Sequence, residues 1–159
     1  VERLVLISST PRFVNGMQWE YGIEPAVLDG FARDLAGDYH AALRRFLVLQ
    51  TQGDADAREL LRRLRERLCA RDLSGAGALE AALRILQDTD LRDSLPWIAQ
   101  PALILHGERD AIAPLAAGEY LQRSLPRAAL EVFAGAGHAP FVFRPQLTAR
   151  RIVEFCGEQ

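Results

Sequence analysis

The feature that most restricts the fold is an alternation of strand-like and helix-like segments in the last third of the chain. Apolar runs at residues 101–106 and 130–133 predict two β-strands. Helices are predicted after each of them, at residues 115–125 and 145–155. A β-α-β-α order gives parallel strands with helices packed on the faces of the sheet, so we expect an α/β fold.

The preceding residues combine one short strand with a long helical region. Residues 3–7 predict a strand that runs into the turn signal Ser8-Ser9-Thr10-Pro11. From about 25 to 87, apolar residues recur at helical spacing, which indicates an insertion over the end of the sheet. We therefore expect three parts: a core strand and turn at 1–14, a helical lid at 15–89, and a carboxyl-terminal α/β core at 90–159 that opens with a linker at 90–96.

Composition excludes several classes of function. A net charge of −2 over 159 residues argues against a general nucleic-acid binder. No apolar run reaches the roughly 18 residues of a membrane span, and no signal peptide is visible. Cys69 and Cys156 lack metal-ligand spacing and are expected to be buried thiols. We therefore expect a cytoplasmic protein with neither nucleic-acid nor membrane partners.

Two polar residues follow predicted strands at the places where parallel sheets carry their functional groups. Asp110 comes just after the strand at 101–106, and His138 follows the strand at 130–133. An aspartate can hold one imidazole nitrogen of a histidine and leave the other free to act as a base. The order Asp then His matches the last two members of a Ser…Asp…His triad. Taken singly, Asp110 could be a turn former or helix cap and His138 a structural histidine.

The nucleophile of such a triad is missing from the sequence. There is no Gly-x-Ser-x-Gly motif, and Ser8-Ser9 ends a strand without flanking glycines. The other serines have no suitable setting either: Ser74, Ser94 and Ser124. The chain also opens in mid-strand at Val1, so we expect a fragment or the later part of a processed protein. The absent amino-terminal half would then be another chain, a part not included, or be replaced by self-association.

Five stretches together resemble one known fold family. They are 3–11, Arg45-Phe46-Leu47-Val48-Leu49-Gln50-Thr51, 90–101, Gly107-Glu108-Arg109-Asp110 with Pro114, and Gly137-His138-Ala139-Pro140-Phe141. The chain is similar to the carboxyl-terminal part of the α/β-hydrolases. Within them it resembles the family of biotin-synthesis esterases that cleave the methyl ester of pimeloyl-acyl-carrier protein.

The resemblance implies a role for each matching residue. His138 would be the general base and Asp110 its orienting partner, with no metal or organic cofactor. The helical middle would be a lid whose acyl pocket is lined by Phe46, Leu47, Val48, Leu49 and Gln50. Arg45, Arg58 and Arg62 match basic positions that hold the acyl carrier, while Ala41 replaces a further one. Without the resemblance, the lid helix could equally be packed on the core, and the arginines could be a solvated face.

Two other classes of function remain open at this point. The first is another α/β-hydrolase, such as a carbon–carbon bond hydrolase, a dehalogenase, a peptidase or a general esterase. The second is a non-catalytic lid module that binds an acyl carrier through Arg58 and Arg62 and does not need His138. Because the serine is absent, we expect the 159-residue chain alone to be inactive.

Overall fold

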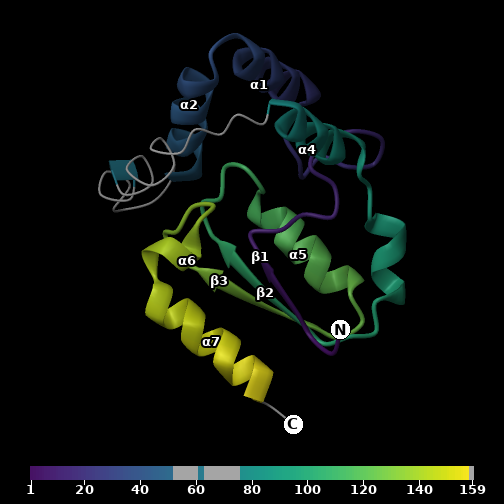
Figure 1. Ribbon diagram of the computed structural model, residues 1–159. Coiled ribbons are helices and arrows are strands. Elements are labelled where there is room, and N and C mark those ends of the chain that lie inside the picture. Colours follow the sequence, from purple (N-terminus) through teal and green to yellow (C-terminus); the bar gives the residue numbers. More distant parts are fainter. Residues whose placement is uncertain (52–60, 63–75, 158–159) are drawn as a thin grey trace.

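The computed structural model describes residues 1–51, 61–62 and 76–157, and its centre is a parallel three-stranded sheet (Figure 1). The strands are β1 (Leu4–Ile7), β2 (Ala102–Gly107) and β3 (Ala128–Phe133), in the order β1-β2-β3. Ile7 lies opposite Leu105, and Gly107 lies opposite Phe133. The carboxyl ends of all three strands therefore meet at one edge of the sheet.

Helices cover both faces of this sheet, as the β-α-β-α pattern predicts. Figure 1 shows α5 (Leu115–Ser124) on one face, and α6 (Pro140–Phe143) and α7 (Pro145–Gly157) on the other. Alternate residues of β2 face opposite sides, so Ile104 packs with Leu121 of α5, whereas Leu103 and Leu105 pack toward α7. The two apolar layers are Leu95, Ala102, Ile104, Leu121 and Leu125 on one side, and Leu103, Leu105, Phe133 and Ala136 on the other. The expected α/β class is confirmed.

The described residues between β1 and β2 include three α-helices. They are α1 (Pro25–Gly37), α2 (Tyr39–Thr51) and α4 (Ala76–Asp88), and Figure 1 places them beyond the carboxyl ends of the strands. The helix α1 starts at Pro25, where a fixed φ and a missing amide hydrogen cost nothing. It contacts both α2 and α4. The function of these helices as a lid stays a prediction.

The structure differs from the sequence-based expectation in two places. The predicted linker contains a 3-10 helix, η1 (Arg92–Trp97), because Leu95 is drawn into the apolar layer under α5. The prediction that Cys156 is buried is wrong: it is exposed near the end of α7, where Ile152 and Phe155 take the positions that face the sheet. Cys69 lies outside the described residues. Within the described part, no helix is long and apolar enough to cross a membrane.

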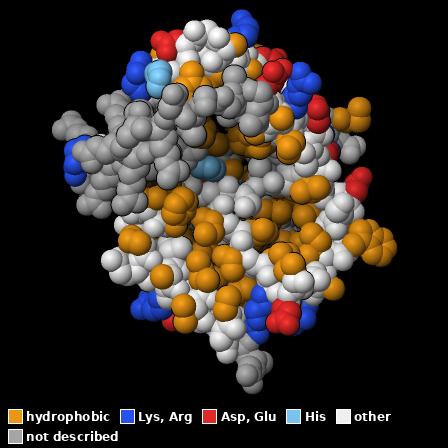
Figure 2. All heavy atoms as spheres, viewed as in Figure 1, with side chains coloured by type: hydrophobic (Ala, Val, Ile, Leu, Met, Phe, Trp, Pro, Cys, Tyr) orange, Lys and Arg blue, Asp and Glu red, His pale blue; other side chains and the backbone are white. Residues whose placement is uncertain are grey.

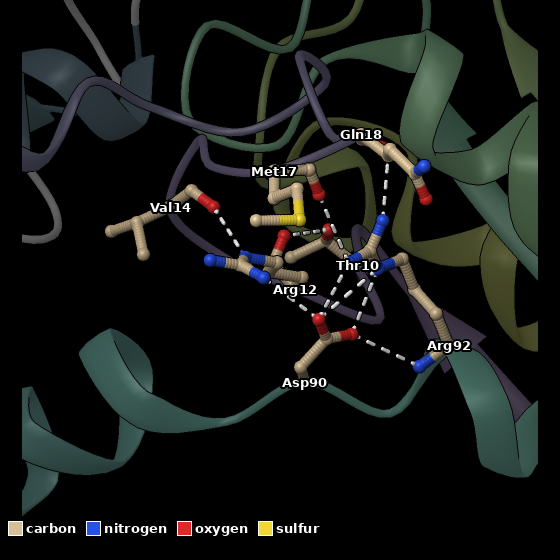
Figure 3. Close-up of polar contacts among 7 residues, drawn as sticks. All are labelled: Thr10, Arg12, Val14, Met17, Gln18, Asp90 and Arg92. Atoms are coloured by element: carbon tan, nitrogen blue, oxygen red, sulfur yellow. Dashed lines mark hydrogen bonds and ion pairs between the residues drawn. The ribbon is translucent and has the colours of Figure 1, made fainter.

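A polar cluster around Asp90 links the two segments that lead into and out of the inserted helices, near Arg12 and near Asp90 (Figure 3). The Asp90 carboxylate accepts hydrogen bonds from Arg12 Nη1 at 2.8 Å and from Arg92 Nη2 at 2.7 Å. Arg92 also donates to the carbonyls of Gln18 and Met17, at 2.8 and 3.3 Å. Segments 78 positions apart in the sequence are thereby joined just outside the insertion.

Hydrogen bonds from the Arg92 guanidinium hold the pKa of the Asp90 carboxyl well below its ordinary range. The same contact raises the pKa of Arg92. Because the folded-state pKa of Asp90 is depressed, its contribution to stability is present above the unfolded pKa of about 3.9 and is lost as the pH falls below it. The ion pair should therefore stabilise the protein at neutral pH and fail in acid.

We expect Asp90→Asn to lower the free energy of unfolding at pH 7 by about 1–2 kcal/mol, since it leaves two partly buried guanidinium groups without a carboxylate. The Asp90 side chain is 32% exposed, so water and salt screen part of the effect. The deficit relative to the parent should shrink as the pH falls below about 4. Urea unfolding at several pH values measures this.

Glu80→Gln provides the matched control, because Glu80 pairs with Arg84 on α4 where both side chains are about two-thirds exposed. It should leave the unfolding midpoint where it is. An Asp90→Asn deficit that stays constant from pH 7 to pH 3 would contradict the assignment of the stabilising charge to Asp90.

Candidate active site

Asp110 is placed by the turn that ends β2. The strand stops at Gly107, and the Asp110 amide returns to the Gly107 carbonyl at 3.3 Å. The Asp110 Oδ1 atom accepts hydrogen bonds from the backbone amides of Ile112 and Ala113, both at 2.9 Å. Its side chain has no exposed surface. The Asp110 carboxylate thus stabilises the conformation of the loop that carries it.

His138 is placed by the loop that follows β3. Gly135 takes a φ of +68°, which favours glycine, and its amide donates to the Glu108 Oε2 atom at 2.8 Å. The Arg109 amide donates to the Ala136 carbonyl at 2.9 Å. These bonds attach the loop after β3 to the loop after β2. The side chains that the two loops carry therefore have a fixed relative position.

Gly107 lies where the two loops come closest. A Cβ atom at this position would lie 2.0 Å from the carbonyl oxygen of Gly137 and 2.6 Å from that of Ala136. Both neighbours are backbone atoms, which cannot swing away as a flexible side chain would. Glycine is therefore required by the close approach of the two loops.

The structure brings Asp110 and His138 together, as their positions at neighbouring strand ends predict. The His138 Nδ1 atom lies 2.9 Å from Asp110 Oδ2 and 3.1 Å from Oδ1. Since a carboxylate only accepts, Nδ1 carries the hydrogen, and Nε2 of the neutral ring keeps its lone pair. The His138 side chain is 21% exposed, whereas that of Asp110 is buried. Asp110 is both a turn former and the partner of a histidine, so the two interpretations of this residue are compatible.

The five residues predicted to line an acyl pocket lie together on α2, one of the inserted helices. The Phe46 ring packs on Phe31 of α1, with ring centroids 5.5 Å apart. Leu47 is buried, Gln50 is half-buried, and Val48 and Leu49 are 47% and 41% exposed. The helix thus has both a packed side and an accessible side. The role of these residues as a pocket stays a prediction.

The basic residues predicted to hold a carrier are only partly described. Arg45 is exposed on α2 and forms an ion pair with Asp34 of α1. Arg62 is also exposed. Arg58 lies outside the described residues. The role of these arginines in binding a carrier stays a prediction.

Ser8 has the backbone of a sharp turn but not the setting of a nucleophile. Its φ is +47°, and its hydroxyl is buried with no hydrogen-bond partner in the described part of the chain. A nucleophilic serine of this fold would start a helix directly after its strand. Here the next helix begins only at Pro25. The lack of flanking glycines already argues against Ser8 as the nucleophile, and the topology argues against it independently.

The sequence did not reveal how the loop of Asp110 is held. His106 is completely buried at the second-last position of β2. Its Nε2 atom lies 2.7 Å from the Ala113 carbonyl, seven residues further along the chain. The sequence does place a histidine directly before Gly107-Glu108-Arg109-Asp110. Its hydrogen-bond partner is the backbone carbonyl of Ala113, and no sequence pattern identifies a backbone partner.

A parallel sheet with an Asp–His pair at its carboxyl edge is the arrangement of an α/β hydrolase. A family model described as alpha/beta hydrolase fold matches residues 1–145. The chain belongs to the α/β-hydrolase family.

Within that family, the chain is similar to a particular group of esterases. The chain is 42% identical over 146 residues to a pimeloyl-(acyl-carrier protein) methyl ester esterase of Nitrosomonas europaea, which covers 92% of this chain and 58% of the relative. It is 41% identical over 155 residues to the enzyme of the same name from Stenotrophomonas maltophilia, covering 98% of this chain and 60% of the relative. The chain thus spans about three-fifths of the length of the curated relatives it matches.

Solved structures agree with the fold. An esterase from Exiguobacterium antarcticum superimposes with a TM-score of 0.86 at 24% identity, over 99% of this chain and 57% of that one. An enol-lactonase from Burkholderia xenovorans gives a TM-score of 0.80 at 24% identity, over the same shares of the two chains. At this level of identity the likeness concerns the fold alone.

Proposed function

We propose that the protein carrying this chain is a serine carboxylesterase that cleaves the methyl ester of pimeloyl-acyl-carrier protein. The observation that carries the catalytic part is the hydrogen bond from His138 Nδ1 to the buried Asp110 carboxylate. The substrate part rests on the name shared by relatives about 41% identical to the chain. The nucleophilic serine and the oxyanion hole would lie outside these 159 residues.

In the acylation step, His138 Nε2 accepts the hydroxyl proton of the serine as its oxygen attacks the ester carbonyl. Asp110 keeps the hydrogen of the neutral ring on Nδ1, so that the lone pair is on Nε2, and it stabilises the imidazolium that forms. The tetrahedral intermediate then expels the methoxy group, which takes the proton back from Nε2 and leaves as methanol. An acyl-enzyme remains.

In the deacylation step, Nε2 removes a proton from water, which attacks the acyl-enzyme. Collapse of the second intermediate breaks the serine–acyl bond and returns the proton to the serine oxygen. The product is a free carboxylic acid at the end of the carrier-bound acyl chain.

The inserted helices fit the role of a lid over this site. Figure 2 shows the surface hollowed between the inserted helices and the sheet, with hydrophobic side chains around the hollow. On α2, Val48 and Leu49 offer exposed apolar surface to a methylene chain, and the half-buried Phe46 and Gln50 would add an apolar and a polar contact. Leu47 is buried and would support this lining from behind. Arg45 and Arg62, with Arg58, would pair with an acidic carrier, since guanidinium groups bind carboxylate and phosphate well.

The free edge of β1 supports a further part of the sheet that carries the serine. The amides of Leu4 and Ser8 donate to carbonyls at Pro101 and Leu105, on the β2 side. Backbone groups alternate along a strand, so those of Val5 and Ile7 point to the other edge. Within the described residues no strand pairs there. We propose that the remainder of the hydrolase fold covers this edge, rather than a second copy of the chain.

The test is hydrolysis of pimeloyl-acyl-carrier-protein methyl ester by the full-length protein and by the 159-residue chain, with methanol release and product mass as readouts. The full-length protein should convert the ester, and the chain alone should not, because it lacks the serine. Turnover of the carrier-linked ester should fall with added salt more than turnover of a small p-nitrophenyl ester.

Three results would oppose the proposal. Hydrolysis of p-nitrophenyl esters by the isolated chain, lost on His138→Ala, would place a nucleophile within the 159 residues. Turnover of small esters without the carrier-linked ester would indicate a general esterase. Carrier binding that survives His138→Ala in a full-length protein without any turnover would indicate a non-catalytic module.

A further inference from the structure

His106 is a buried titratable side chain that the proposed reaction does not use. It lies at the second-last position of β2 and has no exposed surface. Its Nε2 atom is 2.7 Å from the Ala113 carbonyl oxygen. A carbonyl only accepts, so Nε2 is the donor and the ring hydrogen is on this atom. The Nδ1 atom is buried and has no hydrogen-bond partner among the residues that the structure describes.

The peptide groups of Ala113 are held from both sides. Its amide donates to Asp110 Oδ1 at 2.9 Å, and its carbonyl accepts from His106. The direct distance from His106 Nε2 to Asp110 Oδ2 is 3.6 Å, too long for a hydrogen bond. His106 therefore acts on Asp110 through Ala113.

The helix α5 is shaped to seat the His106 ring. Gly118 of α5 faces the ring, and a Cβ atom there would lie 2.7 Å from Nδ1 and 3.0 Å from Cγ. The helix backbone thus comes close to one side of the imidazole, while Ala113 lies within hydrogen-bonding distance of Nε2. A ring held in this way has little freedom to turn.

We propose that His106 is a positioning residue that fixes the Asp110 carboxylate against His138 through its hydrogen bond to the Ala113 carbonyl. Without this bond Ala113 keeps its amide contact with Asp110 Oδ1 but loses the donor at its carbonyl, and Asp110 Oδ2 is then no longer fixed opposite His138 Nδ1. The expected effect on kcat rests on the proposed esterase function, whereas the expected effect on the hydrogen bond between Asp110 and His138 does not.

Paired variants separate the hydrogen bond from the bulk of the ring. His106→Gln places an amide donor as many bonds from Cα as Nε2 is, so it can reach Ala113. His106→Leu fills a similar volume without a donor, and His106→Asn carries an amide that is one atom too short. In the full-length protein we expect His106→Leu and His106→Asn to lower kcat by about 10- to 100-fold with little change in KM, and His106→Gln to restore most of it.

The spectroscopic readout is the proton resonance of His138 Nδ1–H, which a hydrogen bond to a carboxylate shifts downfield and protects from exchange. It should be present in the parent and in His106→Gln, and broadened or absent in His106→Leu and His106→Asn. Ile104→Ala removes an equally buried side chain from the same strand without touching Ala113, so it should destabilise the protein and leave this resonance in place.

Two results would overturn the proposal. One is a folded His106→Leu or His106→Asn protein in which the His138 resonance and kcat match the parent. The other is a His106→Gln protein as impaired as His106→Leu, which would show that the donor is not the cause. If the parent has no esterase activity, the proposed function fails, and the resonance still decides the role of His106.

Discussion

Asp110→Asn should reduce kcat for ester hydrolysis by about 10⁴-fold in the full-length protein while leaving the fold intact. The structure fixes how the new amide would sit. Oδ1 accepts hydrogen bonds from the amides of Ile112 and Ala113, so the amide oxygen of the asparagine must take that place. The NH₂ group then occupies the position of Oδ2 and points at His138 Nδ1, 2.9 Å away.

The consequence for His138 is a change of tautomer. An NH₂ group can only donate, so Nδ1 must become the acceptor and the ring hydrogen moves to Nε2. The nitrogen needed as the base then has no lone pair. His138→Ala removes the base itself and should also abolish turnover, so the two variants together distinguish loss of the base from its misorientation.

The measurement is single-turnover hydrolysis across pH, with circular dichroism to confirm folding. Asp93→Asn, an exposed aspartate on η1, is the matched control and should behave as the parent. If Asp110→Asn keeps kcat within tenfold of the parent, Asp110 is only a turn former, and the orienting role proposed for it is wrong.

Gly107→Ala should cost about 3 kcal/mol or more of unfolding free energy, a large effect for a single methyl group. The new Cβ would lie 2.0 Å from the Gly137 carbonyl oxygen and 2.9 Å from its carbon. Relief requires the loop that carries His138 to move away from the loop that carries Asp110. That movement would break the bond between the Arg109 amide and the Ala136 carbonyl. Activity should therefore fall together with stability.

Urea unfolding of the full-length protein measures the first effect, and ester hydrolysis of the folded fraction measures the second. Gly30→Ala is the control, because among the described residues a Cβ atom there, inside α1, would have only the end of the Arg33 side chain within 4.0 Å. It should be neutral or stabilise by up to about 1 kcal/mol. If the free energy of unfolding of Gly107→Ala lies within about 1 kcal/mol of the parent value, the two loops separate easily, which would contradict their close packing.

Much of the architecture follows from local patterns. The strands β2 and β3 and the helices α5 and α7 fall within a few residues of their predicted bounds, since apolar runs and helical spacing report burial directly. The approach of Asp110 to His138 was also predictable, because two neighbouring parallel strands with one crossover helix end at the same edge of the sheet.

Other features carry no local signal. The helix η1 forms where a linker was expected because Leu95 finds an apolar layer made by α5 and the sheet. Cys156 is exposed because the turn of α7 at that point is oriented by Ile152 and Phe155. In each case a contact with a distant element decided the outcome.

By itself, the sequence determined most of the strands and helices, their order, and the position of Asp110 and His138 just after two neighbouring strands. Only the tertiary structure decided that Asp90 fastens Arg12 to Arg92, that Gly107 must lack a side chain, and that His106 holds Ala113. Periodicity encodes which side of an element is buried, and this is a local property. Hydrogen-bond partners and close approaches depend on register and packing between elements, and those distances exist only once the chain has folded.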